Sequence, residues 1–301
     1  MADILIPTVA QGLMWALMAL GVYITFRVLD IADLSVEGSF PLGAAVAATA
    51  LVSGYGVTAA FLLAAIAGAL AGIVTGILTT KLKIPPLLAG ILTMIGLYSV
   101  NLHVMGKANV ALLRVDTVFS YAAGMGLTSD MAMMAVGLVG VMLVGVILYW
   151  FFGTELGCGI RATGCNPVMS RAQGINTDLS KVIGLSLSNG LVALSGALLC
   201  QYQGYADINM GRGAVVIGLA AVVIGEAVVK HISPNFAVRL TGVLVGAVIY
   251  YLVYQVIIFV GFDTDLLKMF SALVVAAFLG VPYVKKQLAR KHHVKGGIRH
   301  A

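Results

Sequence analysis

The segment Gly153–Lys181 reads GTELGCGIRATGCNPVMSRAQGINTDLSK and separates two strongly apolar stretches of the chain. Its middle has the signals of a short helix: Asn166 is a good N-terminal cap, Pro167 suits the first helical position, and Gly174 suits the left-handed residue that ends a helix. These signals predict about two turns over Pro167–Gln173. Because so short a helix is not stable alone in water, it is either a surface for a partner subunit or an ordinary, well-capped connection.

Composition places the rest of the chain in a membrane. Of the 301 residues, 60% are hydrophobic and 10% are charged, and the mean hydropathy is +1.04, which excludes a soluble globular domain. A helix needs roughly 20 apolar residues to cross a hydrocarbon core. We predict an all-α, polytopic helical membrane protein with about eight or nine transmembrane helices. The apolar runs are Ile4–Phe26, Phe40–Val52, Val57–Thr79, Ile84–Met105, Met131–Phe152, Val182–Gln201, Ala214–Val229, Leu240–Val260 and Leu266–Tyr283.

Lysine and arginine residues predict which loops face the cytoplasm. If Gly153–Lys181 is cytoplasmic, alternation of the spans places all but four of the 18 basic residues inside, the exceptions being Lys107, Arg114, Arg212 and Lys268. The N-terminus is then outside and the C-terminus inside. If Leu29–Ser39 re-enters the membrane instead of crossing it, one span is lost and the N-terminus moves inside.

The charge distribution divides the chain into one transmembrane domain, residues 1–283, and a basic cytoplasmic tail, residues 284–301. The tail accounts for the whole net charge of +6 and contains no acid. Such a tail suits the anionic inner leaflet of a bilayer. We do not expect nucleic acid as a partner, because aromatic residues do not interleave with these charges.

Two segments break the apolar pattern in a similar way. Leu29–Ser39 reads LDIADLSVEGS and contains three acids beside apolar runs. Acids at membrane depth are costly and usually face protein or a wet cavity, so this segment is either a broken helix beside a pathway or a simple cytoplasmic turn. Asp207–Gly218, DINMGRGAVVIG, resembles Asp33–Gly43, DLSVEGSFPLG. In the alternating topology the two run in opposite directions, which predicts two interrupted helices related by an inverted repeat.

Missing motifs limit the mechanism. The spans predicted with most certainty contain no mid-membrane Asp, Glu or Lys, which proton-coupled carriers need. The sequence has no GxxxxGK[ST] phosphate loop, no HExxH and no GxSxG. We therefore expect no enzyme activity, catalytic residue, metal or cofactor in this chain, and we interpret it as a translocation subunit driven by another protein. The candidate pathway residues, for which helix–helix hydrogen bonding is the alternative role, are Asp33, Ser35, Glu37, Tyr98, Asn101, Asn189, Asn209 and Tyr254.

The stretch RATGCNPVMSRAQGIN, Arg161–Asn176, resembles the cytoplasmic coupling segment of ATP-binding cassette importer permeases of the branched-chain amino acid and ribose class. Ser170 stands where that family commonly has alanine. The resemblance extends to DLSV at Asp33–Val36, SGA at Ser195–Ala197 and AAVVIG at Ala220–Gly225. It covers most of the chain from residue 29 to residue 283.

The resemblance implies a set of partners and a location. The partners are a second permease copy in a homodimer, a cytoplasmic subunit that binds ATP, and an extracytoplasmic solute-binding protein at the outer loop Gly106–Asp130. The location is a bacterial plasma membrane, crossed several times, with the C-terminus cytoplasmic. The residues that would couple the chain to the ATPase are Arg161, Gly164, Asn166, Pro167, Val168, Met169, Arg171 and Gly174, with the two arginines as polar anchors.

The substrate expected from the resemblance is an amino acid, because the chain is similar to a compact subgroup of tryptophan and tyrosine importers. A sugar or nucleoside is the alternative within the same family. Outside the family, the alternatives are an ion-gradient-driven secondary transporter or channel and, third, a membrane scaffold without transport.

Overall fold

The computed structural model describes residues 2–113, 115–126, 128–229 and 235–259, with isolated positions between 269 and 280. The ninth predicted span, Leu266–Tyr283, and the basic tail therefore lie outside the continuously described residues. The chain divides into two compact units, Met1–Leu252 and Val253–Ala301. The fold and the candidate sites described below belong to the first unit.

Helices make up nearly all of the described structure, as the composition predicts. Six helical segments are long and apolar enough to cross a membrane, and two shorter apolar helices of 17 and 16 residues accompany them within the described residues. The helices are α1 (Ala2–Tyr23), continued by the π-helical turn η1 (Ile24–Val28), α2 (Val36–Val52), α3 (Val57–Thr80), α4 (Pro86–Met105), α5 (Val118–Gly124), α6 (Ser129–Gly153), α7 (Glu155–Cys165), α8 (Pro167–Ala172), α9 (Thr177–Gln203), α10 (Ala214–Val229) and α11 (Phe236–Phe259). The first eight predicted spans each match one of these apolar helices.

The long helix α9 lies at the centre of the first unit and packs against α1, α2 and α3. Small residues allow this close approach, as they do in other membrane bundles. A Cβ atom on Gly43 of α2 would lie 1.9 Å from the carbonyl oxygen of Ala193, and one on Gly196 of α9 would lie 2.0 Å from that of Phe40. The backbones of α2 and α9 are therefore in direct contact.

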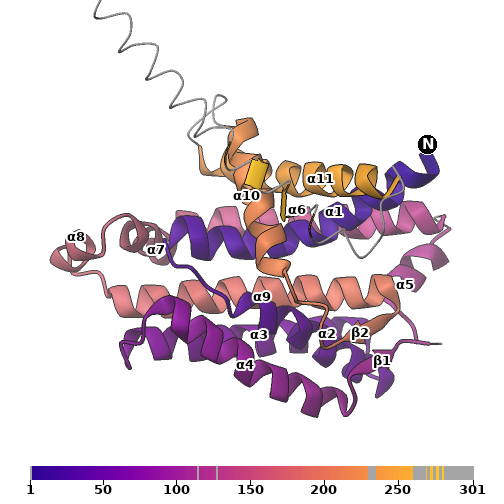
Figure 1. Cartoon of the computed structure of the whole chain (residues 1–301), viewed down its shortest axis with the longest axis horizontal. Coiled ribbons are helices and arrows are strands. Elements are labelled where there is room, and N and C mark those ends of the chain that lie inside the picture. Colours follow the sequence, from indigo (N-terminus) through magenta and orange to yellow (C-terminus); the bar gives the residue numbers. More distant parts are fainter. Residues whose placement is uncertain are drawn as a thin grey trace, which may run out of the picture. The chain divides into compact units, whose positions relative to one another are not determined.

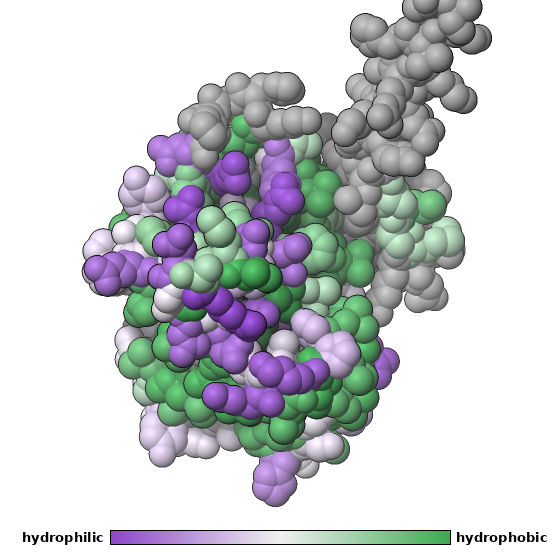
Figure 2. Space-filling view, turned by 90° about the vertical axis from the view of Figure 1, so that its left-hand side faces the viewer, coloured by the Kyte–Doolittle hydropathy of each residue, from purple (hydrophilic) through white to green (hydrophobic). Residues whose placement is uncertain are grey.

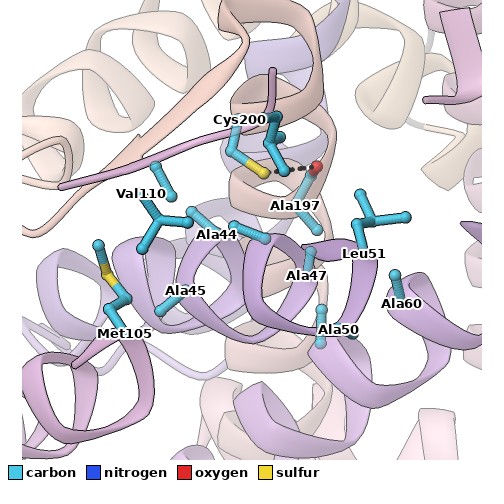
Figure 3. Close-up of a cluster of buried hydrophobic side chains, with 14 residues drawn as sticks. Ala44, Ala45, Ala47, Ala50, Leu51, Ala60, Met105, Val110, Ala197 and Cys200 are labelled. Atoms are coloured by element: carbon cyan, nitrogen blue, oxygen red, sulfur yellow. Dashed lines mark hydrogen bonds between the residues drawn. The ribbon is translucent and has the colours of Figure 1, made fainter. Parts of the chain in front are cut away.

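Buried alanines extend this close packing along α2. Figure 3 shows Ala44, Ala45, Ala47 and Ala50 beside side chains from α3, α4 and α9. Cys200, also in this cluster, has its thiol 3.2 Å from the carbonyl oxygen of Ala197 and is fully buried. Helix α2 is therefore enclosed by its neighbours, whereas many large apolar side chains of α3, α4 and α6 are exposed and suit contact with lipid.

The two ends of the bundle carry different structures (Figure 1). Helices α7 and α8 lie at one end. At the opposite end, strand β1 (Asn109–Ala111) pairs antiparallel with β2 (Tyr205–Asp207), near α5. The ammonium of Lys83 lies 3.5 Å from the carboxylate of Asp178, so the α3–α4 loop is at the α7–α8 end. This is the grouping of loops that alternating spans predict.

The first interruption differs in detail from the prediction. The predicted span Phe40–Val52 is longer in the structure, where α2 begins at Val36 and so includes part of Leu29–Ser39. The non-helical part is Leu29–Leu34, where Asp30 has a φ of +56°. Pro41 is tolerated close to the start of the helix, where it leaves the carbonyl of Glu37 without its usual helical donor.

Candidate coupling surface and translocation site

The polar segment between α6 and α9 folds as two short helices at one end of the molecule. The Thr154 hydroxyl caps α7 by accepting from the amide of Gly157 at 3.3 Å. The Asn166 side chain caps α8 and accepts from the amides of Val168 and Met169 at 3.1 and 3.0 Å. Gly174 has a φ of +82°, as expected for the residue that ends this helix. The short capped helix of the sequence prediction is confirmed, with its last residue at Ala172.

Helix α8 presents two apolar side chains to the surface. Val168 is 78% exposed and Met169 is 60% exposed, whereas the next residue, Ser170, is buried and donates to the carbonyl of Asn166. Figure 2 views the molecule from this end, where hydrophilic side chains gather around a few apolar ones. A polar surface with a small apolar centre suits contact with another protein.

The two arginines predicted as anchors both contact the chain itself. The Arg161 guanidinium lies over the ring of Phe236, 5.0 Å from its centroid. Arg171 donates to the Thr177 hydroxyl at 2.7 Å and to Asp178 at 3.3 Å. These contacts stabilise the α7–α8 segment, and Val168 and Met169 are the large apolar side chains on the exposed surface of α8.

Helix α7 also touches the beginning of the interrupted segment. A Cβ atom on Gly164 would lie 1.8 Å from the carbonyl oxygen of Val28, the last residue of η1. On the same side of the molecule, Arg27 of η1 forms an ion pair with Glu226 of α10. A displacement of α7 would therefore reach the end of α1 and the Leu29–Leu34 connection directly.

A buried polar cluster forms where this connection meets α9. One carboxylate oxygen of Asp33 accepts from the amide and hydroxyl of Ser35 at 2.8 and 2.6 Å. The other oxygen accepts from the side-chain amide of Asn189 at 2.9 Å. The side-chain oxygen of Asn189 accepts from the Ser39 hydroxyl at 2.6 Å and lies 3.1 Å from the Ser35 hydroxyl, whose single proton is shared with Asp33. Asp33 is 6% exposed, and the other three side chains are fully buried.

The cluster extends toward α4 and α1. Asn101 of α4 donates to the carbonyl of Gly38 at 3.1 Å, while its own side-chain oxygen is buried without a hydrogen-bond partner among the described residues. The indole nitrogen of Trp15 is unpartnered in the same sense. The Trp15 ring stacks on Phe40 with centroids 4.9 Å apart and lies 5.8 Å from Tyr251. Buried polar atoms without partners are unusual and are often found at functional sites.

The two interrupted helices meet beside this cluster. The carboxylate of Glu37, in the first turn of α2, accepts from the amide of Gly213 at 3.1 Å, just before α10 begins. A Cβ atom on Gly211 would lie 2.2 Å from the carbonyl oxygen of Glu37. This contact joins the two segments whose sequences resemble each other.

The predicted pathway residues fall into two groups. The structure brings Asp33, Ser35, Glu37, Asn101 and Asn189 together around the start of α2. Tyr98 is 48% exposed on α4, Asn209 is exposed in the turn after β2, and Tyr254 belongs to the second compact unit. Sequence reasoning missed Trp15, Phe40 and Ser39; the one available signal was that Ser35 and Ser39 are four residues apart, which places them on one face of a helix.

The position of Asp33 bears on the prediction that the chain is not an ion-coupled carrier. The prediction against ion coupling considers acids in the middle of the predicted spans, and Asp33 lies in the segment that connects the first two of them. The structure buries the Asp33 carboxylate against α9, so an acid is present inside the helix bundle.

Comparison with known proteins agrees with these features. Residues 4–279 match the family described as the permease component of branched-chain amino acid transport systems. The chain is 38% identical to the tyrosine transport system permease protein of Clostridioides difficile (strain R20291) over 275 residues, 91% of this chain and 90% of that protein. It is 33% identical to the uncharacterized protein RP368 of Rickettsia prowazekii (strain Madrid E), over 95% of this chain and 99% of that one. It is 28% identical to the autoinducer 2 import system permease protein LsrC of Yersinia pestis (strain Pestoides F), over 69% of this chain and 58% of that one. No solved structure gives a significant match.

Proposed function

This chain belongs to the family of branched-chain amino acid transport permeases, a family of ATP-binding cassette systems, and we propose that it carries an amino acid with an aromatic side chain through a bacterial plasma membrane. It does so as one of two identical permease subunits, with residues 1–283 as the permease domain and the C-terminus in the cytoplasm. ATP is bound by a separate cytoplasmic subunit, and the solute is delivered by an extracytoplasmic binding protein. The chain itself needs no cofactor.

The observation that carries this proposal is the exposed apolar tip of α8, Val168 and Met169. A capped helix that projects from the polar end of a membrane bundle provides a rigid surface to which a cytoplasmic ATPase can bind. Movement of α8 passes to α7, whose Gly164 lies against the carbonyl of Val28. The Leu29–Leu34 connection and the polar cluster come next along the chain, so nucleotide-driven movement has a short route to the pathway.

The proposed substrate follows from the chemistry of the cluster and from a relative. Asp33 suits the α-ammonium group of an amino acid, and Ser35, Ser39 and Asn189 suit its other polar atoms. Trp15, Phe40 and Tyr251 form an aromatic group whose Phe40 directly follows Ser39 on α2, and such rings suit an aromatic side chain. One relative with 38% identity is named as a tyrosine transport permease. A sugar would use the polar groups but would have less use for the buried carboxylate.

The first experiment isolates the chain from its native membrane and assays the eluate for ATPase activity. We expect an ATPase subunit to come down with the wild type and to be lost from the double variant Val168→Asp/Met169→Asp. The matched control is Leu113→Asp, which introduces an acid at a side chain that is 81% exposed at the opposite end. Retention of the ATPase by the α8 variant, or its loss from both variants, would count against α8 as the docking surface.

An ion-driven carrier is the second candidate, because Asp33 provides a buried acid that could bind a proton or sodium ion. Uptake of labelled tyrosine into intact cells separates the two mechanisms. The importer requires uptake to stop when ATP is depleted and to persist when an ionophore collapses the ion gradients at constant ATP. Uptake that follows the gradients instead would establish the carrier.

A further inference from the structure

A pocket of about 580 Å³ lies where α6 ends and α7 begins. Tyr149 and Trp150 line it from the last turns of α6, and Phe236 lines it from the first turn of α11. Arg161 of α7 is the charged residue in its lining. All of these residues belong to the first compact unit, and the pocket is separate from the buried polar cluster.

The position of the pocket corresponds to the edge of a bilayer. Helix α6 is a membrane-crossing candidate that ends at Gly153, so its last turns reach the membrane surface. Tyr149 is 52% exposed and Trp150 is 71% exposed. Tyrosine and tryptophan are enriched at this depth because their rings are apolar while their polar atoms favour the headgroup region.

No Asp or Glu is among the described residues that line the pocket, so the positive charge of Arg161 is not neutralised there. Arg161 has the Phe236 ring as its contact and donates no hydrogen bond to any described residue. The nearest acid along α7, Glu155, lines a different pocket, between α7 and α9. Arg171, the other arginine of this segment, is by contrast paired with Asp178. The Arg161 guanidinium therefore has hydrogen-bond donors available for an anion.

We propose that this pocket binds the phosphate headgroup of an anionic phospholipid from the adjoining leaflet. Arg161 would hold the phosphate, because a guanidinium can donate two parallel hydrogen bonds to it. The exposed rings of Tyr149 and Trp150 would lie beside the glycerol and the first part of the acyl chains. The exposed, apolar side of α6 continues from Trp150 into the membrane, so an acyl chain has a surface to follow.

This role differs from the ATPase anchor that the sequence suggested for Arg161, and it stands independently of the proposed ATPase contact. It connects the lipid to the coupling segment, because Arg161 and Gly164 both lie on α7. A lipid in the pocket would stabilise α7 in its contact with η1.

The test is native mass spectrometry of the full-length chain in detergent, titrated with phosphatidylglycerol or with phosphatidylcholine. The variants are Arg161→Gln and, as the matched control, Arg171→Gln, which removes the same charge from the same end of the molecule. We expect Arg161→Gln to bind phosphatidylglycerol about fivefold or more weakly, since one basic residue near an anionic surface is worth about that factor. Arg171→Gln should bind like the wild type, and Arg161→Lys should recover part of the binding.

Three results would overturn the proposal. Equal loss in both glutamine variants would show a diffuse charge effect. Equal binding of phosphatidylglycerol and phosphatidylcholine, which both carry a phosphate, by the wild type would show that the net negative charge of the headgroup is not what is recognised. Displacement of the lipid by millimolar inorganic phosphate would identify a site for a free anion. The thermal unfolding midpoint of Arg161→Gln is measured as a control. If it is unchanged, misfolding does not explain the expected loss of phosphatidylglycerol binding.

Discussion

Asn189 connects three other side chains at the centre of the first unit, and its removal tests the polar cluster at the scale of one residue. In Asn189→Leu the Asp33 carboxylate loses a donor and the Ser39 hydroxyl loses its acceptor, whereas the Ser35 hydroxyl keeps Asp33 as its acceptor. A buried polar group without its partner costs about 1–3 kcal/mol, and a charged one costs more. We expect a lower thermal unfolding midpoint in detergent and loss of solute uptake.

Two further variants show whether the Asp33–Asn189 contact itself is responsible. Ser186→Ala removes a hydrogen bond of the same helix to the carbonyl of Ala69, outside the cluster, and should leave uptake unchanged. The exchange Asp33→Asn/Asn189→Asp restores a carboxylate–amide pair and should recover most of the lost stability. If the exchange is as unstable as Asn189→Leu, the pairing is not what holds these segments together.

Residues of the two candidate sites differ in how far the sequence could predict them. Asn166, Pro167 and Gly174 act within one short helix, so their spacing alone predicted the cap and the stop. The partner of Asp33 is 156 residues away along the chain, and no local pattern indicates it. The contact of Arg161 with Phe236 also joins residues far apart along the chain, so the sequence suggested an outward-facing anchor where the structure has a ring beneath the guanidinium.

The cap of α8 can be tested at the scale of the element. Asn166→Ala leaves the amides of Val168 and Met169 without their acceptor and should destabilise the helix by about 1 kcal/mol. Hydrogen exchange at these amides should become faster, and ATPase coupling should weaken. Asn166→Asp keeps an acceptor at the cap and should behave like the wild type. Unchanged exchange in Asn166→Ala would mean that contacts other than the cap order α8.

The contact between α2 and α9 gives a second prediction at this scale. Gly43→Ala places a Cβ atom 1.9 Å from the carbonyl oxygen of Ala193, so the helices must move apart. Overpacking of this kind costs about 1–3 kcal/mol, and we expect less monodisperse protein and a lower unfolding midpoint. The control, Gly96→Ala on α4, meets nothing within 4 Å and should be neutral or slightly stabilising. Equal behaviour of the two variants would contradict the close contact.

Element boundaries were predictable where the chain meets water and less so inside the bundle. The apolar run 214–229 begins at the first residue of α10, because turn residues precede it. For α2, the apolar run begins at Phe40, whereas the helix begins at Val36. Packing of Gly38 against α4 and of Gly211 against the carbonyl of Glu37 supports this early turn, and such tertiary contacts leave no periodic signal in a sequence.

At the scale of the whole molecule, the three cysteines report on sidedness. Cys158 and Cys165 are exposed on α7, and Cys200 is buried. If the α7–α8 end is cytoplasmic, a membrane-impermeant maleimide should label the chain in inverted vesicles and leave it unlabelled in intact spheroplasts. Cys200 should remain unlabelled in both.

A matched probe at the opposite end completes this measurement. Leu113→Cys, in a chain with Cys158→Ser and Cys165→Ser, should reverse the pattern, because Leu113 is 81% exposed beyond β1. Labelling of both probes from the same side would contradict the alternating arrangement of the helices. The assignment rests on the distribution of lysine and arginine, which the sequence alone supplies.

The pairing of β1 with β2 has a mechanical consequence. It fastens the connection after α4 to the connection that leads into α10, through Asn109–Asp207, Val110–Ala206 and Ala111–Tyr205. The α4–α5 and α9–α10 connections, which would otherwise move independently, are held together as one unit by this pairing. A force applied to the β1 loop by a docked protein is therefore delivered to the start of α10, where Gly213 meets Glu37. Forces applied at the β1–β2 end and at α8, on opposite ends of the bundle, would therefore both act on the same pair of interrupted helices.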